Sequence, residues 1–301
     1  MSSLPSSSPV PLLLPLPRLT QAKAPLTCEI DSVNEYGEHH AVSIPAERAL
    51  TVYVDKRELV TLMTLGAHPE LLVLGYLRNQ RLVKSVHDIE SITVDWEVGA
   101  VAVKTRHGIE NIEEKTARRV VTTGCGQGSV FGGLMDDVEQ IKLPVNAMIS
   151  QSQLYALVNT IRLKETTYKS SGSVHACALF ALAGGEPQML LFVEDVGRHN
   201  AIDTIAGWMS MQTDTALLEV TKVFYTTGRL TSEMVIKSAQ MGVPIVISRS
   251  GITQMGHQVA QMVGLCAIGR ATNKRFVCYT HVERLKLEPG LAVRPEAAER
   301  A

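Results

Sequence analysis

The hydrophobic pattern of the first half of the chain is that of paired β-strands. Apolar and polar residues alternate with a period of two over residues 49–65, on both sides of Lys56 and Arg57, which predicts a hairpin. The same alternation over residues 91–105 predicts a second strand pair. Between these pairs, Pro69 opens a run in which leucines recur at helical spacing, so a helix is expected there. The first half is therefore predicted to be rich in strands.

The second half follows a different pattern, in which strands and helices alternate. Ser150 and Gln153 have the spacing of a capping box before an apolar helical run. Apolar strand candidates and helix candidates then follow one another, and Gly242 with Pro244 is typical of a helix end. This order predicts an α/β (α+β mixed) fold, in which a mixed sheet carries helices on both of its faces.

Composition changes this picture at the two ends of the chain. The first residues are rich in proline and serine, lack the pattern of a secretory signal, and contain only a short, proline-broken apolar run. We therefore expect a soluble protein without a membrane segment. The expected division of the chain is a disordered tail over residues 1–27, a smaller strand-rich amino-terminal domain over residues 28–148, an α/β domain over residues 149–288 and a frayed tail over residues 289–301.

Charge and cysteine content exclude several classes of protein. The 301 residues include 29 Lys+Arg against 30 Asp+Glu, so the chain lacks the excess of cations that broad binding to nucleic-acid phosphates needs. Nucleic acid is therefore not an expected partner. The five cysteines are odd in number and widely spaced, which fits neither a dense disulfide framework nor a C-x-x-C zinc clasp and predicts a reducing, cytoplasmic location. They are Cys28, Cys125, Cys177, Cys266 and Cys278.

A glycine-rich segment makes Cys125 the first candidate for chemistry. Glycines on both sides leave its thiol unshielded, as a sulfur that must reach another protein requires, and Arg118 and Arg119 are placed to stabilise the thiolate. The alternative is a tight turn in which Cys125 is incidental. Ser129 stands where a dinucleotide-binding fingerprint has its third glycine, which disfavours that function. The other four cysteines lie in apolar, strand-like runs and are expected to be buried.

The segment EDVGRHNAID is the second candidate. Asp195, His199 and Asp203 are four residues apart and would share one helix face if the helix began early enough. Such a set of side chains is able to transfer a proton or to ligate a metal ion, and Arg198 is able to bind a phosphate or carboxylate group. The segment therefore supports an alternative function, a metal-dependent hydrolase. The other interpretation is structural, with the acidic residues capping a helix and His199 satisfying a buried backbone group.

Two strand-to-helix turns, which contain Arg229 and Arg249, form the third candidate. Ligands of open α/β sheets collect at the carboxyl ends of strands, and helix starts with Arg and Ser donors suit phosphate groups. Either turn taken alone is also what ordinary helix capping requires, but the occurrence of two such turns favours ligand binding. His175 and Cys177 are similar to part of a zinc deaminase site, yet the H-x-E and P-C-x-x-C patterns of such enzymes are missing.

Taken together, these segments resemble the formate dehydrogenase accessory sulfurtransferase family, FdhD. The resemblance extends from about Cys28 to Arg284 and includes the leucine-rich helix, the Cys125 segment and SSGSVHACAL. Its most specific segments are EDVGRHNAID and TTGRLTSEMVIKSAQ, which stand in the family's order and at the family's separation. The resemblance implies a sulfur carrier protein that is required for formate dehydrogenase activity.

The resemblance also implies a site and partners. Cys125 matches the first cysteine of the family's C-G-x-C-G motif, so it would accept sulfur from a cysteine desulfurase as a persulfide and act as a sulfurtransferase. Gly128 takes the place of the second cysteine, and a relay by one thiol is chemically sufficient. The client would be molybdenum bis(molybdopterin guanine dinucleotide), which receives sulfur before its insertion into formate dehydrogenase.

The implied fold is cytidine-deaminase-like, and the implied assembly is a homodimer. No tightly held metal of the protein's own is expected. A noncatalytic cofactor chaperone, in which Cys125 is dispensable, stays as a further alternative. For the cofactor, Arg229 and Arg249 are predicted to hold phosphates, and the carboxy-terminal strand is carried over from the family as part of the same site. The carried-over residues are Phe276, Val277, Cys278, Tyr279, Thr280 and His281.

Overall fold

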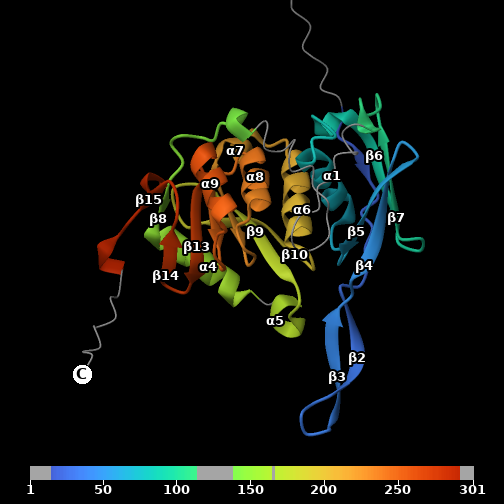
Figure 1. Cartoon of the computed structure of the whole chain (residues 1–301), viewed down its shortest axis with the longest axis horizontal. Helices are drawn as coiled ribbons and strands as arrows, with labels where there is room; N and C mark the ends of the chain where they lie inside the picture. Colours follow the sequence, from blue (N-terminus) through green and yellow to red (C-terminus); the bar gives the residue numbers. More distant parts are fainter. Residues whose placement is uncertain (1–14, 114–137, 165–166, 292–301) are drawn as a thin grey trace, which may run out of the picture.

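A five-stranded sheet, the smaller of the two main sheets of the described chain, occupies its amino-terminal part. The computed structural model describes residues 15–113, 138–164 and 167–291 (Figure 1). The described strands of this sheet lie in the order β1-β6-β7-β4-β5, and helix α1 (Pro69–Asn79) packs its leucines against one face. The strands are β1 (Arg18–Leu19), β4 (Arg48–Val54), β5 (Arg57–Thr64), β6 (Ile89–Asp95) and β7 (Ala100–Thr105).

Both predicted strand pairs and the predicted helix are confirmed. β4 and β5 form the first hairpin, and Asp55 and Lys56 take up the positive φ angles of its turn. β6 and β7 form the second antiparallel pair. α1 begins at Pro69, where the missing amide hydrogen costs nothing because the first helical amides have no partner within the helix.

The disordered tail predicted over residues 1–27 is too long at its carboxyl end. β1 pairs in parallel with β6 inside that range, and Leu16 and Leu19 pack against the core of the small sheet. These apolar contacts order a segment whose prolines predicted disorder. A further hairpin, β2 (Thr27–Val33) with β3 (His39–Pro45), projects away from both sheets in Figure 1. Residues 1–14 lie outside the described part.

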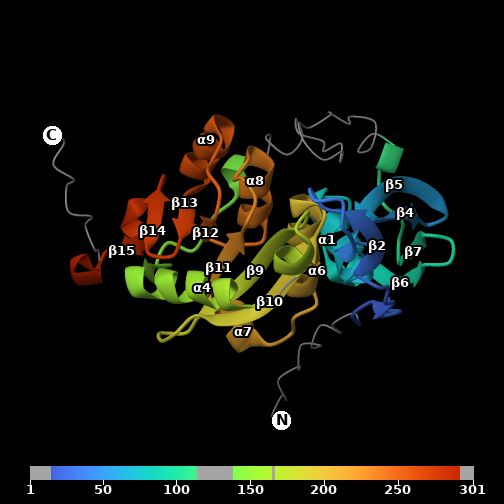
Figure 2. The same ribbon diagram turned by 90° about the horizontal axis from the view of Figure 1, so that it is seen from below.

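The larger sheet confirms the predicted mixed α/β fold. Its described strands lie in the order β10-β9-β11-β12-β13-β14, with β11, β12 and β13 parallel and β9 antiparallel between β10 and β11. Helix α4 covers one face, and α6, α8 and α9 cover the other (Figure 2). The strands are β9 (His175–Leu182), β10 (Gln188–Asp195), β11 (Thr221–Thr226), β12 (Ile245–Ser248), β13 (Cys266–Thr272) and β14 (Arg275–Cys278).

The helices of this domain begin and end at residues that the sequence marks. The Ser150 hydroxyl accepts from Gln153 N at 3.1 Å and the Gln153 side chain accepts from Ser150 N at 3.0 Å, which is the predicted capping box. Gly242 has the positive φ of a residue beyond a helix end. The helices are α4 (Gln151–Leu163), α5 (Thr167–Ser171), α6 (Arg198–Ser210), α7 (Thr215–Glu219), α8 (Ser232–Gln240) and α9 (Gln254–Val263).

Short elements complete the described chain. β8 (Ile149–Ser150) pairs in parallel with β15 (Leu285–Lys286) next to α4. The 3₁₀ helices are Val86–Asp88, Val138–Gln140, Val282–Arg284 and Pro289–Leu291. The frayed tail predicted from residue 289 therefore begins with a helical turn, and residues 292–301 lie outside the described part.

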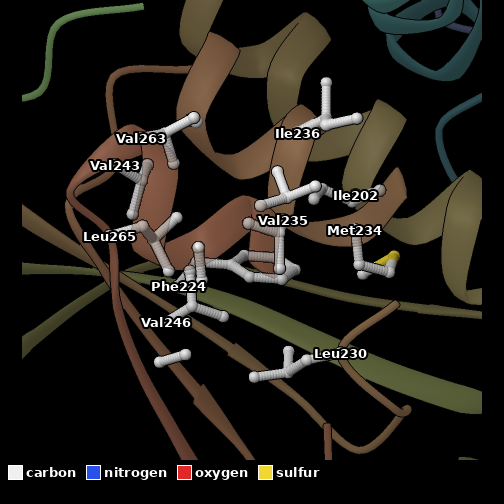
Figure 3. Close-up of a cluster of buried hydrophobic side chains, with 14 of the residues drawn as sticks. Ile202, Phe224, Leu230, Met234, Val235, Ile236, Val243, Val246, Val263 and Leu265 are labelled. Carbon is white, nitrogen blue, oxygen red and sulfur yellow. The ribbon is translucent and has the colours of Figure 1, made fainter. Parts of the chain in front are cut away.

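The main core lies between the larger sheet and its three helices. Phe224 of β11 and Val246 of β12 point from the sheet toward Val235 of α8 and Val263 of α9 (Figure 3). All these side chains are at most 5% exposed. A second cluster on the opposite face packs α4 against the same strands. Burial on both faces explains why these strands are continuous apolar runs in the sequence.

The two domains pack against each other where two helices cross at a pair of glycines. α1 of the small domain lies against α6 of the large domain, and the helices cross at Gly75 and Gly207. A Cβ on Gly75 would stand 1.7 Å from the carbonyl oxygen of Asp203, and one on Gly207 would stand 1.9 Å from that of Leu71. Side chains at these positions would therefore force the helices apart.

Candidate functional site

The carboxyl ends of the strands meet at one edge of the larger sheet. Because β9 runs opposite to its neighbours, its first residue, His175, lies at the same edge as Asp195 at the end of β10. Thr226 ends β11 and pairs with Ser248, the last residue of β12. The turns that follow these strands therefore share one edge, as the sequence predicted for a ligand site.

The two arginine-bearing turns are hydrogen-bonded side by side. Arg249 N donates to Thr226 O at 2.9 Å, and the Ser248 hydroxyl donates to Gly228 O at 2.7 Å. Leu230 N donates to Gly251 O at 2.9 Å. The side chains of Arg229 and Arg249 are exposed. The structure therefore brings these two predicted residues to the same surface, where they can contact a ligand.

A third arginine makes this edge strongly cationic. Arg198, at the start of α6, is buried beneath the Arg229 turn, and a Cβ on Gly228 would stand 2.9 Å from its Cδ. Only glycine leaves room for this arrangement. Burial lowers the pKa of His175, and the charges of Arg198 and Arg229 lower it further. A neutral imidazole among guanidinium groups indicates an edge suited to anions.

A cavity of about 240 Å³ opens between α4 and this edge. Phe192 and Tyr225 contribute aromatic surface, and Arg249 and Thr227 contribute polar groups. The volume is below the range of about 300–1,000 Å³ that holds a whole small ligand, so it suits one ring system with an attached anionic group. The remaining lining residues are Val158, Ile161, Arg162, Ala176, Ala271, Thr272 and Asn273.

The predicted carboxy-terminal strand divides between two faces of the sheet. Tyr279 lies over Gly269, where a Cβ would stand 2.6 Å from its ring, and beside Gly251 of the Arg249 turn. Phe276 and Cys278 instead pack on the α4 face, and Val277 is 42% exposed. Tyr279 is thus the member of this strand that adjoins the arginine turns. Thr280 and His281 follow in the turn, where Thr280 is buried and His281 is hydrogen-bonded to Glu283.

The segment EDVGRHNAID joins the two domains. α6 begins at Arg198, so Asp195 belongs to β10 and does not share a helix face with His199 and Asp203. The Asp195 carboxylate accepts from the Thr64 hydroxyl at 2.5 Å, from Leu65 N at 3.2 Å and from the Asn200 amide at 2.7 Å. Thr64 and Leu65 belong to the small domain. Burial raises the pKa of Asp195, although these hydrogen bonds act in the opposite direction.

The other members of the predicted hydrolase set are engaged with α8. Asp203 contacts Lys237 Nζ at 2.8 Å, and His199 Nε2 lies 3.5 Å from a carboxylate oxygen of Glu233. Burial and the charge of Lys237 lower the pKa of His199 to about 3, so its imidazole is neutral. Within the described ranges, no three His, Cys, Asp or Glu residues are grouped as metal ligands. Because each side chain has a separate partner, the arrangement does not favour the metal-dependent hydrolase.

Sequence reasoning missed the residues that complete this buried network. Glu233 and Lys237 are four apart on α8 and both face inward, and Asn79 of α1 donates to Asp203 at 2.6 Å. The spacing of Glu233 and Lys237 was a signal of an ion pair. Nothing in the sequence indicated that the pair would be buried.

The cysteines differ in exposure. Cys177 is buried as predicted, donates to the Thr226 hydroxyl at 3.3 Å, and has its pKa raised to about 12 by burial. Cys266 is also buried, whereas Cys278 is partly exposed. The prediction was wrong for Cys28, which is exposed because β2 belongs to the projecting two-stranded hairpin and most of its residues are exposed. Cys125, with Arg118, Arg119, Gly128 and Ser129, lies outside the described residues.

The architecture defines the class of protein. It is an α/β protein of two closely joined domains, whose strand ends present a cationic edge suited to anionic ligands. None of the helices that the structure describes is long and apolar enough to span a bilayer.

Comparison with known proteins identifies the family. The FdhD/NarQ family model matches residues 45–286, and the chain belongs to this family. The sulfur carrier protein FdhD of Bacillus subtilis is 33% identical over 242 residues, which are 80% of this chain and 89% of that protein. The sulfur carrier protein FdhD of Wolinella succinogenes is 27% identical over 253 residues, 83% of this chain and 84% of that protein.

A solved structure shows the same fold. It is the crystal structure of a proposed formate dehydrogenase accessory protein from Desulfotalea psychrophila, with a TM-score of 0.67 and 21% sequence identity. The match covers 87% of this chain and 100% of that one. The predicted resemblance to the FdhD family and the predicted fold class are both confirmed.

Proposed function

We propose that this protein is a sulfur carrier that serves a formate dehydrogenase and holds sulfur as a persulfide on Cys125. Membership of the FdhD/NarQ family carries this proposal, because the matched residues include Cys125 and the similar curated proteins are sulfur carriers by name. The proposed activity is that of a sulfurtransferase in the cytoplasm, where reducing conditions keep thiols free.

Sulfur transfer to Cys125 needs no external oxidant. The Cys125 thiolate attacks the outer sulfur of a persulfide on a cysteine desulfurase, the sulfur–sulfur bond of that persulfide breaks, and the desulfurase cysteine leaves as a thiolate. One thiol suffices for this exchange, so the glycine at position 128 does not prevent it. A homodimer, which the family resemblance implies, is part of the proposal.

The client proposed for the cationic edge is molybdenum bis(molybdopterin guanine dinucleotide). This substrate offers phosphate groups for Arg229 and Arg249 and flat ring systems for the cavity beside Phe192 and Tyr225. The cavity has the size of one ring system, which agrees with recognition of one end of a long ligand. The Cys125 persulfide would give up its outer sulfur to this substrate before the cofactor enters the dehydrogenase: the sulfur–sulfur bond breaks, Cys125 leaves as a thiolate, and two electrons from a dithiol reductant bring the sulfur to the sulfide level.

Replacing Cys125 tests the carrier function. A Cys125→Ala variant is expected to lose the ability to restore formate dehydrogenase activity in cells that lack the wild-type gene, because Cys125 is the thiol proposed to accept sulfur from the desulfurase. Incubation with desulfurase and cysteine is expected to add about 32 Da to Cys125 of the wild-type protein. The matched control is Cys177→Ala, which removes a buried thiol and is expected to keep the activity. Full activity of Cys125→Ala would support a cofactor chaperone instead.

Replacing Arg249 tests the cofactor edge. Arg249→Ala is expected to weaken binding of guanosine diphosphate by about tenfold, because one charge-assisted hydrogen bond contributes about 1.5 kcal/mol. Isothermal titration calorimetry measures the dissociation constant. Arg18→Ala is the control, since Arg18 is exposed in the small domain and pairs with Glu90. Equal affinities of the two variants would place the nucleotide away from this edge.

A further inference from the structure

Two cysteines outside the glycine-rich segment face each other across the last strand pair. Cys266 of β13 and Cys278 of β14 have their Sγ atoms 3.8 Å apart. Cys278 is paired in register with Ile268, which is two residues after Cys266, so both cysteine side chains point to the α4 face. A disulfide requires about 2.05 Å between the sulfurs, so the two Sγ atoms must move closer together before they can bond.

The two thiols are not equivalent. Cys266 is fully buried, whereas Cys278 lies on the edge strand β14 and is partly exposed. The hydrogen bond between them lowers the pKa of Cys278 and raises that of Cys266. Cys278 is therefore the accessible thiol that ionises first, and Cys266 is the protonated thiol behind it.

The turn after β14 holds this pair in place. The buried Thr280 hydroxyl donates to Leu265 O at 2.7 Å and accepts from Ala267 N at 3.1 Å. Tyr279 N donates to Ala267 O at 2.8 Å. These bonds tie the end of β14 to the residues on either side of Cys266. The same turn places Tyr279 beside Gly251, so Cys278 lies on the strand that leads to the cationic edge.

We propose that Cys266 and Cys278 form a second sulfur-reactive site, a dithiol that accepts a sulfane sulfur and releases it as hydrosulfide. In the first step, the Cys278 thiolate attacks the outer sulfur of a persulfide donor, and the donor leaves as a thiolate. In the second step, the Cys266 sulfur attacks Sγ of the Cys278 persulfide. A disulfide forms between the two cysteines, the outer sulfur leaves as hydrosulfide, and the Cys266 proton is released with it.

The dithiol would supply the electrons that delivery of sulfur as sulfide requires. A persulfide carries its outer sulfur at the zero-valent level, whereas a sulfide ligand of a metal needs two more electrons. The two thiols supply those electrons and become the disulfide, and a dithiol reductant of the cell resets the pair by exchange. The identity of the natural donor, the Cys125 persulfide, rests on the proposed function, but the chemistry of the pair does not.

The experiment uses the full chain with Cys28→Ser and Cys125→Ser as the reference protein, and glutathione persulfide as the donor. The reference protein is expected to release about one equivalent of hydrosulfide and to lose about 2 Da as the Cys266–Cys278 disulfide forms. With Cys266→Ser added, Cys278 is expected to gain about 32 Da and hydrosulfide release is expected to fall at least about tenfold. With Cys278→Ser added, neither change is expected. Cys177→Ser is the matched control and should behave as the reference protein.

These variants keep the proposal falsifiable. Because the reference protein lacks Cys125 and receives its sulfur from outside, loss of the Cys125 function does not affect the result. Cys266→Ala replaces Cys266→Ser if circular dichroism shows that the serine disrupts folding. Hydrosulfide release that persists without Cys266, a reference protein that forms no Cys266–Cys278 disulfide, or a Cys266→Ser variant in which Cys278 gains no sulfur would overturn the proposal.

Discussion

Lys237→Met is expected to lower the free energy of unfolding by about 3–5 kcal/mol. The Lys237 side chain is fully buried and contacts Asp203 at 2.8 Å and Glu233 at 3.5 Å. Burial alone would lower the pKa of Lys237, but the two carboxylates raise it, so the ammonium group is charged. Removing it leaves two carboxylates in the interior without their cation. Urea denaturation followed by circular dichroism measures the loss.

A matched control for this substitution exists in the small domain. Lys104 pairs with Glu90 at 2.7 Å, nearly the same distance, but its side chain is 65% exposed. Lys104→Met is expected to change the stability by less than about 1 kcal/mol, because water solvates the carboxylate that remains. If both variants lost the same small amount, the carboxylates near Lys237 would be neutral in the folded protein, and the interpretation of this network as ionic would be wrong.

Gly75→Ala is expected to destabilise the protein by about 3 kcal/mol or more, because overpacking of a rigid contact cannot be relieved locally. The added methyl group would meet the backbone of Asp203 at 1.7 Å, and a backbone carbonyl cannot rotate away as a side chain can. Gly207→Ala meets the backbone of Leu71 in the same way. Thermal and urea unfolding of the two variants measure the effect.

Gly185→Ala is the control for the helix crossing. A Cβ at this position has no atom within 4 Å, and Gly185 does not have a positive φ. The substitution is expected to be neutral or to stabilise the protein by a few tenths of a kcal/mol, because it restricts the unfolded chain. Wild-type stability of Gly75→Ala would mean that α1 and α6 can move apart without loss.

Local patterns in the sequence predicted most of the elements. The alternation over residues 49–65, the Ser150 capping box and the apolar runs of the larger sheet all correspond to observed elements. Each pattern reflects contacts within one element or burial of one face, which a short window of sequence records. The turns with Arg229 and Arg249 were predicted for the same reason, since strand ends and helix starts are local features.

Long-range contacts could not be predicted in this way. The partner of Asp195 is Thr64, which is 131 residues away, so the role of this carboxylate in joining the domains was not visible. Gly75 and Gly207 look like weak helix residues in the sequence and show their function only where the helices cross. The burial of Cys28 was predicted wrongly because strand patterns do not tell whether another layer covers the strand.

The contacts across the α1–α6 crossing make the two sheets a single cooperative unit. The Asp195 hydrogen bonds to the small domain and the Asn79 bond to Asp203 are buried, so separating the domains would expose several polar groups without partners at once. We therefore expect that neither domain opens independently at low cost, and that amide exchange in both sheets follows the same global unfolding event. The cationic edge keeps one geometry, and a ligand that binds there stabilises the small domain as much as the large one.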